Sequence, residues 1–585
     1  MHQFKYYQST AKRTTKSHEW QCGREIVKSS RLVRFAIAFI NLIFKMHRNS
    51  KKEPGIFESI VSALSGEPVA ALPILIPSKS ELRAVTETGS FGVTHPSTLF
   101  SQIYLNILKS VEDDASNTQL GPITGATGAV PLTIISTVPD IADHYYDLII
   151  EASFEVIIFS NFWKSSYAAR RIGDALRTLS EKIGRIQRPR VAAKIMFDRG
   201  SVKHVLYPRV AIAEAEWVSL GLPPSQDIPN VDLEVINYHN FPIGTLHSKF
   251  MVIDKRVAVL NSCNIQDNSN LEMMCQFEGP IVHEIWDHAL ATWGLPGSTK
   301  SSRENRNSNA LGSAEGSNAG EAAQAAFSSP SDPLPRRSIA DVTKALNRAV
   351  GSPLPQDITE DDISFAPFRS HARLTTKDIP MVLAPRVPYP SFGNVSLNTP
   401  QNIAWLSAIY FAKSKIFIQT PDLNAPQVIT ALLEAVKRGV EVSVVLCLGY
   451  NDLGEMLPTQ GGHNEWVVTH MMKQLNDEEK GRLKVYWYVG RDMIKPVHAF
   501  KHFRTCHIKL MVVDETIGIQ GSGNQDTQSW FHSQEINIVV DSDEVCRSWM
   551  EQLAANQNSF SYGRGSKTDG VWRDSSGNQV SGYWF

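Results

Sequence analysis

The chain has 585 residues, more than a single hydrophobic core usually supports, so we expect at least two domains. Hydrophobic residues make up 42% of it and charged residues 20%, values that argue against wholesale disorder, a collagen and a multi-span membrane protein. The formal net charge of −1 argues against a dedicated nucleic-acid binder with a strongly basic body.

The first 50 residues are basic. They carry ten Lys or Arg and two Glu, a local charge of +8, which leaves −9 for the rest of the chain. Their apolar stretch, Phe35–Phe44, has ten residues, whereas a membrane-spanning helix needs roughly 20. No cleavage site of a secretory signal is clear. We interpret residues 1–55 as a basic tail that is disordered, directs targeting or lies on a membrane surface.

The six cysteines lack a CxxC spacing and are too few for a disulfide framework in so long a chain. This pattern indicates reduced thiols in an intracellular compartment. Together with the basic tail it predicts a cytoplasmic or organellar protein that is not secreted and that contacts a membrane peripherally.

A linker divides the chain near its middle. Residues 297–337 are rich in Gly, Ser, Ala and Asn and have no apolar periodicity, which predicts a flexible segment. They separate a first half at 56–296 from a second half at 338–556. A Gly/Ser/Asn-rich tail at 557–585 follows, and we expect it to wrap loosely over the surface.

The two halves have the same order of predicted elements. Each opens with a helical pattern headed by a proline, continues with an apolar strand and a histidine-containing strand, and closes with a helix. The proline starts are Pro139 and Pro400, the apolar strands 154–160 and 415–420, and the closing helices 281–292 and 544–554. This order predicts an α/β fold with a largely mixed sheet in each half, and its repetition indicates an internal duplication.

Each histidine-containing strand carries the pattern H-x-K-x₄-D. Residues 246–254 read LHSKFMVID, and residues 506–514 read CHIKLMVVD. Side chains two apart on a strand face the same side, so each His is expected to project together with the Lys that follows it. A Ser and an Asn two residues apart come next, and then a Glu. The members of the two sets are His247, Lys249, Asp254, Ser262, Asn264 and Glu272, and His507, Lys509, Asp514, Ser522, Asn524 and Glu535.

These residue types suit the handling of a phosphate ester. An imidazole serves as nucleophile or general acid near neutral pH, and a lysine supplies positive charge and donors for phosphate oxygens. Ser and Asn add neutral donors, and a carboxylate behind an imidazole fixes its tautomer. With two copies around one phosphorus, one His attacks while the other protonates the leaving oxygen, and the cations stabilise the phosphoryl charge without a metal.

The two motifs resemble the signature of the phospholipase D superfamily, H-x-K-x₄-D followed by G-S-x-N. The resemblance covers about 130–296 and 380–556 and is closest in pattern to the soluble, fungal cardiolipin synthase-like branch. It implies two homologous α/β lobes, each a mixed β-sheet flanked by helices, that share one active site on a pseudo-twofold axis. It also implies a covalent phosphohistidine intermediate, no cofactor and no required metal.

The resemblance also implies roles for the individual residues. The histidines become nucleophile and acid/base, with His247 favoured as the nucleophile, and the glutamates orient them. The phosphate-binding set is Lys249, Lys509, Asn264 and Asn524, supported by Ser262 and Ser522. Asp254 and Asp514 complete the catalytic motifs, although their place at the far end of each strand favours a structural role. In the first motif Asn261 stands where the family has Gly, a residue that permits unusual backbone angles, and Asn is the next most tolerant.

Several neighbouring segments allow two interpretations. The polar loop Gly449–Glu465 is expected to line the entrance to the site rather than to be an ordinary connection, with His463 as a surface residue. The basic residues that precede His507 either hold an anionic headgroup or form a solvated basic loop. They are Lys495, Lys501, His502 and Arg504. Ser529–His532 forms a pocket wall or packs in the core.

The sequence therefore predicts a phospholipase D-type phosphodiesterase or phosphatidyltransferase with a phospholipid substrate, active as a monomer. A nucleic-acid phosphodiesterase of the same superfamily is the alternative, which the near-neutral charge disfavours. A binding protein with a decayed site is a third hypothesis, and the complete motifs argue against it.

Overall fold

The computed structural model describes residues 73–113, 121–294, 371–391, 393–455, 460–499 and 504–580. The predicted basic tail at 1–55, with its apolar stretch, and the predicted linker at 297–337 lie outside these residues, as do Lys501 and His502. Within the described ranges, no helix combines the length and apolar character that crossing a bilayer requires.

The strands form two mixed sheets. In the first sheet the spatial order is β4 (Arg209–Ala211), β5 (Val231–Asn240), β3 (Val191–Phe197), β2 (Glu155–Ser160), β7 (Phe250–Ile253), β8 (Val257–Asn261), β9 (Glu272–Glu278), β1 (Ala126–Ser136) and β10 (His371–Arg373). In the second sheet it is β14 (Leu483–Trp487), β13 (Glu441–Leu446), β12 (Lys415–Gln419), β15 (Leu510–Val513), β16 (Ile517–Gly521), β17 (Asn537–Asp541) and β11 (Ile379–Leu383). Strand β1 also pairs with β11 and so joins the sheets, while the short β6 (Gly244–Thr245) pairs with β5.

The two sheets have the same order and the same strand directions over seven strands. In the first, β5, β3 and β2 are parallel and β7, β8, β9 and β1 continue antiparallel. In the second, β14, β13 and β12 are parallel and β15, β16, β17 and β11 continue antiparallel. The mixed α/β architecture predicted from the sequence is therefore present.

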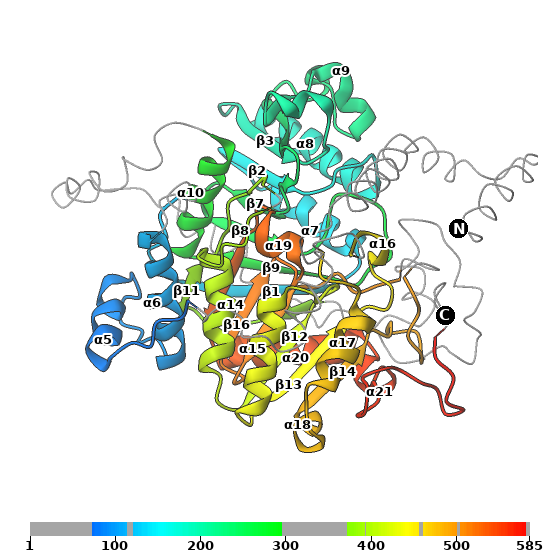
Figure 1. Cartoon of the computed structure of the whole chain (residues 1–585). Helices are drawn as coiled ribbons and strands as arrows, with labels where there is room; N and C mark the ends of the chain where they lie inside the picture. Colours follow the sequence, from blue (N-terminus) through cyan, green and yellow to red (C-terminus); the bar gives the residue numbers. More distant parts are fainter. Residues whose placement is uncertain are drawn as a thin grey trace, which may run out of the picture. The chain divides into compact units, whose positions relative to one another are not determined.

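Helices lie around the strands of both sheets (Figure 1). Helix α7 (Val138–Ile149) contacts α8 (Tyr167–Ile186) in the first half, and α14 (Pro400–Phe411) contacts α15 (Pro426–Lys437) in the second. Helix α10 (Ile281–Trp293) packs on β1, β7, β8, β9 and β11, whereas α20 (Asp543–Asn556) packs on β1, β10 and β16. Both closing helices therefore contact strands from each half of the chain.

The remaining helices lie at the periphery or in the connections. Helix α6 (Thr98–Asp113) packs on α14 and on α5 (Lys79–Thr88). The short helices are α9 (Glu214–Trp217), α16 (Asp452–Glu455), α17 (Asn464–Lys473), α18 (Asp477–Arg482), α19 (Thr527–Phe531) and α21 (Ser559–Tyr562).

Local sequence accounts for the helix starts. Pro139 and Pro400 lie in the first turns of α7 and α14, where a missing N–H costs nothing. Thr399 also caps α14 with its side-chain oxygen. The apolar runs that follow become β2 and β12, whose buried positions fit strands covered on both faces. These predicted elements are confirmed to within two residues.

One hydrophobic core spans both halves. Phe250, Leu260 and Met273 of the first sheet pack in the same cluster as Leu510 and Ile538 of the second. Trp549 of α20 reaches across as well, and its indole Nε1 donates to Thr133 Oγ1 at 3.0 Å. The halves are thus held together by shared apolar burial, the main favourable term in folding.

The motif aspartates stabilise the sheets from the end opposite to the histidines. Asp254 accepts hydrogen bonds from the backbone N–H groups of Ser153, Phe154 and Glu155 at 2.7–2.9 Å, where β2 begins. Asp514 accepts in the same way from residues 413–415, where β12 begins. Their inclusion in the catalytic motifs is therefore corrected, because their carboxylates are committed to the backbone.

Replacing Asp514 by Ala is expected to lower the free energy of unfolding by about 2 kcal/mol, because three backbone donors lose their acceptor. Burial opposes ionisation of this carboxyl, but the backbone donors outweigh it and hold its pKa below the ordinary value. The stabilisation is present above the unfolded pKa of roughly 3.9 and is lost as pH falls through the lower folded value. Urea unfolding followed by circular dichroism at pH 7 and at acid pH measures both effects.

Glu515→Gln is the matched control for this experiment. Glu515 is adjacent in sequence but forms only an exposed ion pair with Lys415, so its loss is expected to change stability by less than about 0.5 kcal/mol. Equal stability of the Asp514 variant and this control would contradict the assigned role.

Candidate active site

The two motifs meet at the carboxyl ends of β2 and β12. Phe250 and Leu510, which begin β7 and β15, pair with Phe159 and Gln419 near the ends of those strands. The segments with His247 and His507 come just before β7 and β15. The predicted strands over 246–254 and 506–514 therefore start too early, because each strand begins after the Lys of its motif.

The segments before β7 and β15 pair with the opposite half. Leu246 bridges Gln534, and the N–H of His247 donates to the Gln534 carbonyl at 2.9 Å. In the other motif Cys506 bridges Leu271, and the N–H of His507 donates to the Leu271 carbonyl at 2.8 Å. In each motif, the backbone at the histidine therefore bonds to the opposite half of the chain, an arrangement called the exchange below.

This exchange gives His247 a carboxylate from the second half. Glu535 follows Gln534, and its Oε1 lies 2.7 Å from His247 Nδ1. Ser522 and Ser529 donate to the same carboxylate at 2.5 and 2.7 Å. Burial opposes ionisation of Glu535, but His247, Lys249 and Ser522 together lower its pKa below the ordinary value. Glu535 is therefore an anion that fixes the His247 ring and leaves Nε2 for substrate.

The reciprocal arrangement holds for His507. Glu272 follows Leu271, and both its oxygens lie 3.2 Å from His507 Nδ1. Ser262 donates its hydroxyl to Glu272 Oε2. The prediction that the two glutamates orient the two histidines agrees with this geometry, and each imidazole takes its carboxylate from the other half of the chain.

Burial disfavours the charged form of both imidazoles. Burial lowers the pKa of His247 to about 4, with Lys249 and Lys509 adding to the decrease and Glu535 opposing it. Burial and Lys509 also lower the pKa of His507, against the effect of Glu272. The His247 side chain is 15% exposed and the His507 side chain 6% exposed, so His247 is the more accessible.

The two lysines are buried beside the histidines. Lys249 Nζ donates to the His247 carbonyl at 2.6 Å, and Lys509 Nζ donates to the His507 carbonyl at 2.6 Å. Burial, followed by the charge of Lys509, lowers the pKa of Lys249 to about 7. Burial likewise lowers the pKa of Lys509. The effect of the Lys509 charge on Lys249 indicates that the two ammonium groups lie close together.

The predicted serines have a different use. Ser262 and Ser522 are fully buried, and each donates its hydroxyl to the glutamate of its own half. Each hydroxyl oxygen also accepts a backbone N–H, from Met273 at 2.9 Å and from Ile536 at 3.1 Å. The serines are therefore not available for direct phosphate binding, and that prediction is corrected: they hold the carboxylates.

The two predicted asparagines are both buried. Asn524 donates to Asp526 at 3.1 Å, while its Oδ1 is buried without a hydrogen-bond partner. Asn264 is also buried, and its Oδ1 accepts a long 3.4 Å bond from the Phe162 N–H. Asn524 is linked to the site through Ser529, whose hydroxyl accepts from the Asn524 N–H at 3.2 Å and donates to Glu535.

The replacement of Gly by Asn261 has a simpler explanation than backbone freedom. Neither Asn261 nor the corresponding Gly521 has a positive φ, and both end their strands. A Cβ on Gly521 would lie 2.2 Å from the Ile536 carbonyl oxygen, so close packing requires glycine there. Asn261 instead donates to the Tyr145 hydroxyl at 2.6 Å. The expectation of unusual backbone angles at this position is therefore wrong.

Two residues at the site were not predicted individually. Ser529, which binds Glu535, belongs to the segment expected to form a pocket wall or core. Tyr450 stacks on His507 with ring centroids 5.9 Å apart, and it belongs to the polar loop expected to line the entrance. Neither residue is part of the motifs. The sequence signals that could have found them are the aromatic-rich segment 529–532 and the polar loop 449–465.

Other neighbouring residues contribute to packing instead. Trp530 is fully buried, and its ring centroid lies 5.5 Å from that of Trp405, so this residue packs in the core. Arg504 is buried in an ion pair with Asp492 and is not free to hold a headgroup. Arg386 is also buried and donates to the Ser533 carbonyl at 2.6 Å. Burial lowers the pKa of its guanidinium to about 9, and the nearby Glu535 opposes this decrease.

Part of the second half of the chain is similar to a known family of domains. Residues 406–556 match the family model described as "Cardiolipin synthase, PLD-like domain". This segment contains the second motif, including His507 and Glu535. No curated protein matches the chain.

The chain is similar to several solved structures, among them the following three. Phosphatidylserine synthase from Haemophilus influenzae Rd KW20 is 11% identical, with 76% of this chain and 90% of that chain covered and a TM-score of 0.44. The phospholipase D family member Nuc from Salmonella typhimurium is 21% identical over 28% of this chain and 89% of that chain, with a TM-score of 0.21. Polyphosphate kinase from Porphyromonas gingivalis is 11% identical over 76% and 50%, with a TM-score of 0.35.

The crossed histidine–carboxylate pairs can be tested by NMR. In Glu535→Gln, the imidazole nitrogen resonances of His247 are expected to shift because its Nδ1 acceptor loses charge, while those of His507 stay in place. Glu272→Gln is the matched variant, in which the resonances of His507 are expected to shift and those of His247 to stay in place. Selective ¹⁵N-histidine labelling, with assignment by single His→Gln variants, provides the measurement. A shift of the histidine from the same half as the mutated glutamate would contradict the crossed pairing.

Proposed function

We propose that the chain is a phospholipase D-type phosphodiesterase or phosphatidyltransferase that acts on phospholipids. The crossed pairs His247–Glu535 and His507–Glu272 carry the proposal, because each holds an imidazole in a fixed orientation beside a buried lysine. The lysine of the other motif also acts on the charge of each imidazole, so the two motifs lie close together. The family match of residues 406–556 supports the same reaction class. We also propose the branch resembling cardiolipin synthase and the two-lobed arrangement around a pseudo-twofold axis, which the equal strand orders support.

In the proposed reaction His247 Nε2 attacks the phosphorus and a phosphohistidine forms. The bond from phosphorus to the leaving oxygen breaks, and protonated His507 gives its proton to that oxygen. Water or an alcohol then attacks the phosphorus, loses its proton to His507 and releases His247. The 2.7 Å bond to Glu535 and the greater exposure of its ring favour His247 as the nucleophile.

The charges of the six central residues suit a phosphodiester. Two lysine cations cancel two glutamate anions, so protonation of His507 for its role as acid leaves a charge of +1. A phosphodiester contributes −1, and the complex of these groups is then neutral. Buried, preorganised donors of this kind stabilise the phosphoryl charge more strongly than water does.

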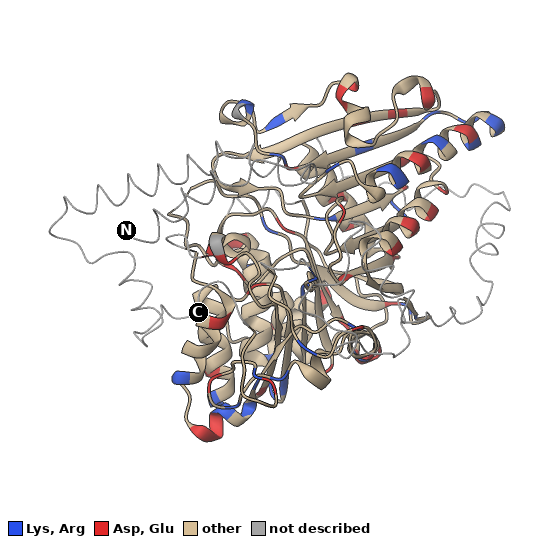
Figure 2. Cartoon of the chain, turned by 90° about the vertical axis from the view of Figure 1, so that its right-hand side faces the viewer, with Lys and Arg blue, Asp and Glu red and all other residues tan. Residues whose placement is uncertain are grey.

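A phospholipid is favoured over nucleic acid by the charge distribution. Figure 2 shows acidic and basic residues interspersed along the same elements of the described chain, whereas tracking a nucleic-acid backbone calls for clustered positive charge. We propose that the basic tail at 1–55 supports peripheral membrane contact in an intracellular compartment and that a single chain holds a complete site.

The substrate assay compares phosphatidylglycerol, phosphatidylcholine with a primary alcohol, and single-stranded DNA. Wild-type protein is expected to turn over a lipid substrate, and His247→Ala and His507→Ala to lose at least about 10³-fold in kcat. Mapping of an acid-quenched phosphohistidine is expected to find it on His247. Turnover of DNA alone would contradict the lipid substrate, and full activity in either variant would contradict the two-histidine mechanism.

The charge of Lys249 predicts a fall in activity at alkaline pH. Its pKa of about 7 means that the ammonium is present below that pH and is lost above it, so kcat/KM on the preferred substrate is expected to fall as pH rises beyond about 7. Lys249→Arg keeps its charge and is expected to move the fall to higher pH. The exposed Lys437→Arg serves as control. An unchanged alkaline limb in Lys249→Arg would contradict this assignment.

A further inference from the structure

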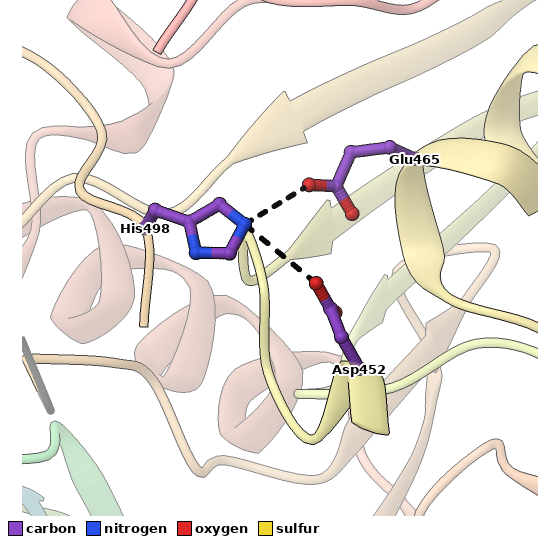
Figure 3. Close-up of side chains that lie close together, drawn as sticks. All are labelled: Asp452, Glu465 and His498. Carbon is purple, nitrogen blue, oxygen red and sulfur yellow. Dashed lines mark ion pairs between the residues drawn. The ribbon is translucent and has the colours of Figure 1, made fainter. Parts of the chain in front are cut away.

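A second cluster of ionisable side chains lies in the described residues outside the phosphodiester site. It consists of Asp452 in α16, Glu465 at the start of α17 and His498 after β14. Figure 3 shows both carboxylates directed at the same nitrogen of the His498 ring. One ligand atom from each residue lies within 4.8 Å of the others.

The separations within this cluster are those of ligands around an ion. His498 Nε2 lies 3.6 Å from Asp452 Oδ2 and 3.8 Å from Glu465 Oε1. Both distances exceed the range of a hydrogen bond, about 2.7–3.2 Å. A single imidazole N–H also cannot point at two carboxylates together. Ligands in a tetrahedral zinc site, about 2.1 Å from the metal, lie roughly 3.4 Å from one another, close to the observed spacing.

The surroundings offer Asp452 few protein donors. Asp452 is more than nine-tenths buried, and its Oδ1 has no hydrogen-bond partner. A divalent cation would balance the charge of the two carboxylates that face His498.

The backbone is shaped to hold His498 in this position. A Cβ on Gly449 would lie 1.9–2.4 Å from three atoms of the His498 ring, so the ring occupies the space of a side chain. Gly449 also has a φ of +67°, which favours glycine. The Ala499 N–H donates to the Leu448 carbonyl at 2.8 Å and ties the two segments together.

We propose that Asp452, Glu465 and His498 bind one divalent transition-metal ion. One imidazole and two carboxylates in a buried site suit Zn²⁺ better than Mg²⁺, which prefers oxygen ligands and retains its waters. His463 Nδ1 lies 3.3 Å from the second oxygen of Glu465 and would support that ligand from outside.

The ion would have a structural role and would take no part in the phosphoryl chemistry. Asp452 lies two residues after Tyr450 in the sequence, and the ring of Tyr450 stacks on His507. Joining α16 and α17 to the segment at His498 would therefore fix the loop that places Tyr450 against the second motif. This proposal does not depend on the proposed function, because metal binding is measured directly.

The test uses the full chain, treated with chelator, dialysed and then titrated with ZnCl₂. Wild-type protein is expected to retain about one zinc per chain by mass spectrometry and to melt at a higher temperature with zinc. Glu465→Gln and His498→Gln are expected to bind at least ~10-fold more weakly in competition with a chromophoric chelator, and excess MgCl₂ is expected not to displace zinc.

His470→Gln is the matched control, because His470 lies in the same helix α17 and binds the Trp466 carbonyl. It is expected to bind zinc like wild type. If His498→Gln proves misfolded by circular dichroism, the partly exposed Glu465 decides the test. Absence of stoichiometric zinc from wild type, or affinity in Glu465→Gln equal to that of the control, would overturn the proposal.

Discussion

The exchange of backbone and carboxylate between the two halves is the constraint on which the site depends. Gln534 bridges the residue before His247, and Leu271 bridges the residue before His507. Because a glutamate follows each bridging residue, each histidine receives its carboxylate from the opposite half. Neither half contains an oriented imidazole by itself, so the shared core is a condition for the site as well as for stability.

The same exchange makes the burial of charge tolerable. Two lysines and two glutamates lie in or near the protein interior, where an uncompensated ion would be costly. Each glutamate accepts from an imidazole and a serine, and each lysine donates to a motif carbonyl. The cost appears in the lowered pKa values of both lysines and both histidines. Groups in this condition respond strongly to a bound anion.

Much of this organisation is readable from the sequence. The repeated order of elements predicts the mixed sheets, and H-x-K-x₄-D with Ser-x-Asn finds the residues that meet at the site. The partner of each histidine is not readable, because Glu272 and Glu535 occur in equivalent places and only the folded bridges decide between them. The true starts of β7 and β15 were missed for the same reason, since the preceding residues pair outside their own sheet.

Other details depend on packing that a pattern does not contain. The hydroxyls of Ser262 and Ser522 face carboxylates in the interior, so a motif that lists them with phosphate ligands misplaces their role. Position 521 requires glycine because the Ile536 carbonyl lies too close for a Cβ, whereas Asn261 donates a hydrogen bond to the Tyr145 hydroxyl. This difference between the two positions cannot be inferred from the sequence. The cluster of Asp452, Glu465 and His498 has no metal-binding spacing in the sequence, because two loops bring it together.

A double-mutant cycle on the free energy of unfolding tests the crossed site most directly. His247→Ala and Glu535→Gln, alone and combined, are predicted to be coupled by at least about 1 kcal/mol, because they remove the same contact. His247→Ala combined with Glu272→Gln is predicted to be additive to within about 0.5 kcal/mol. Stronger coupling of His247 to Glu272 than to Glu535 would contradict the exchange between the halves.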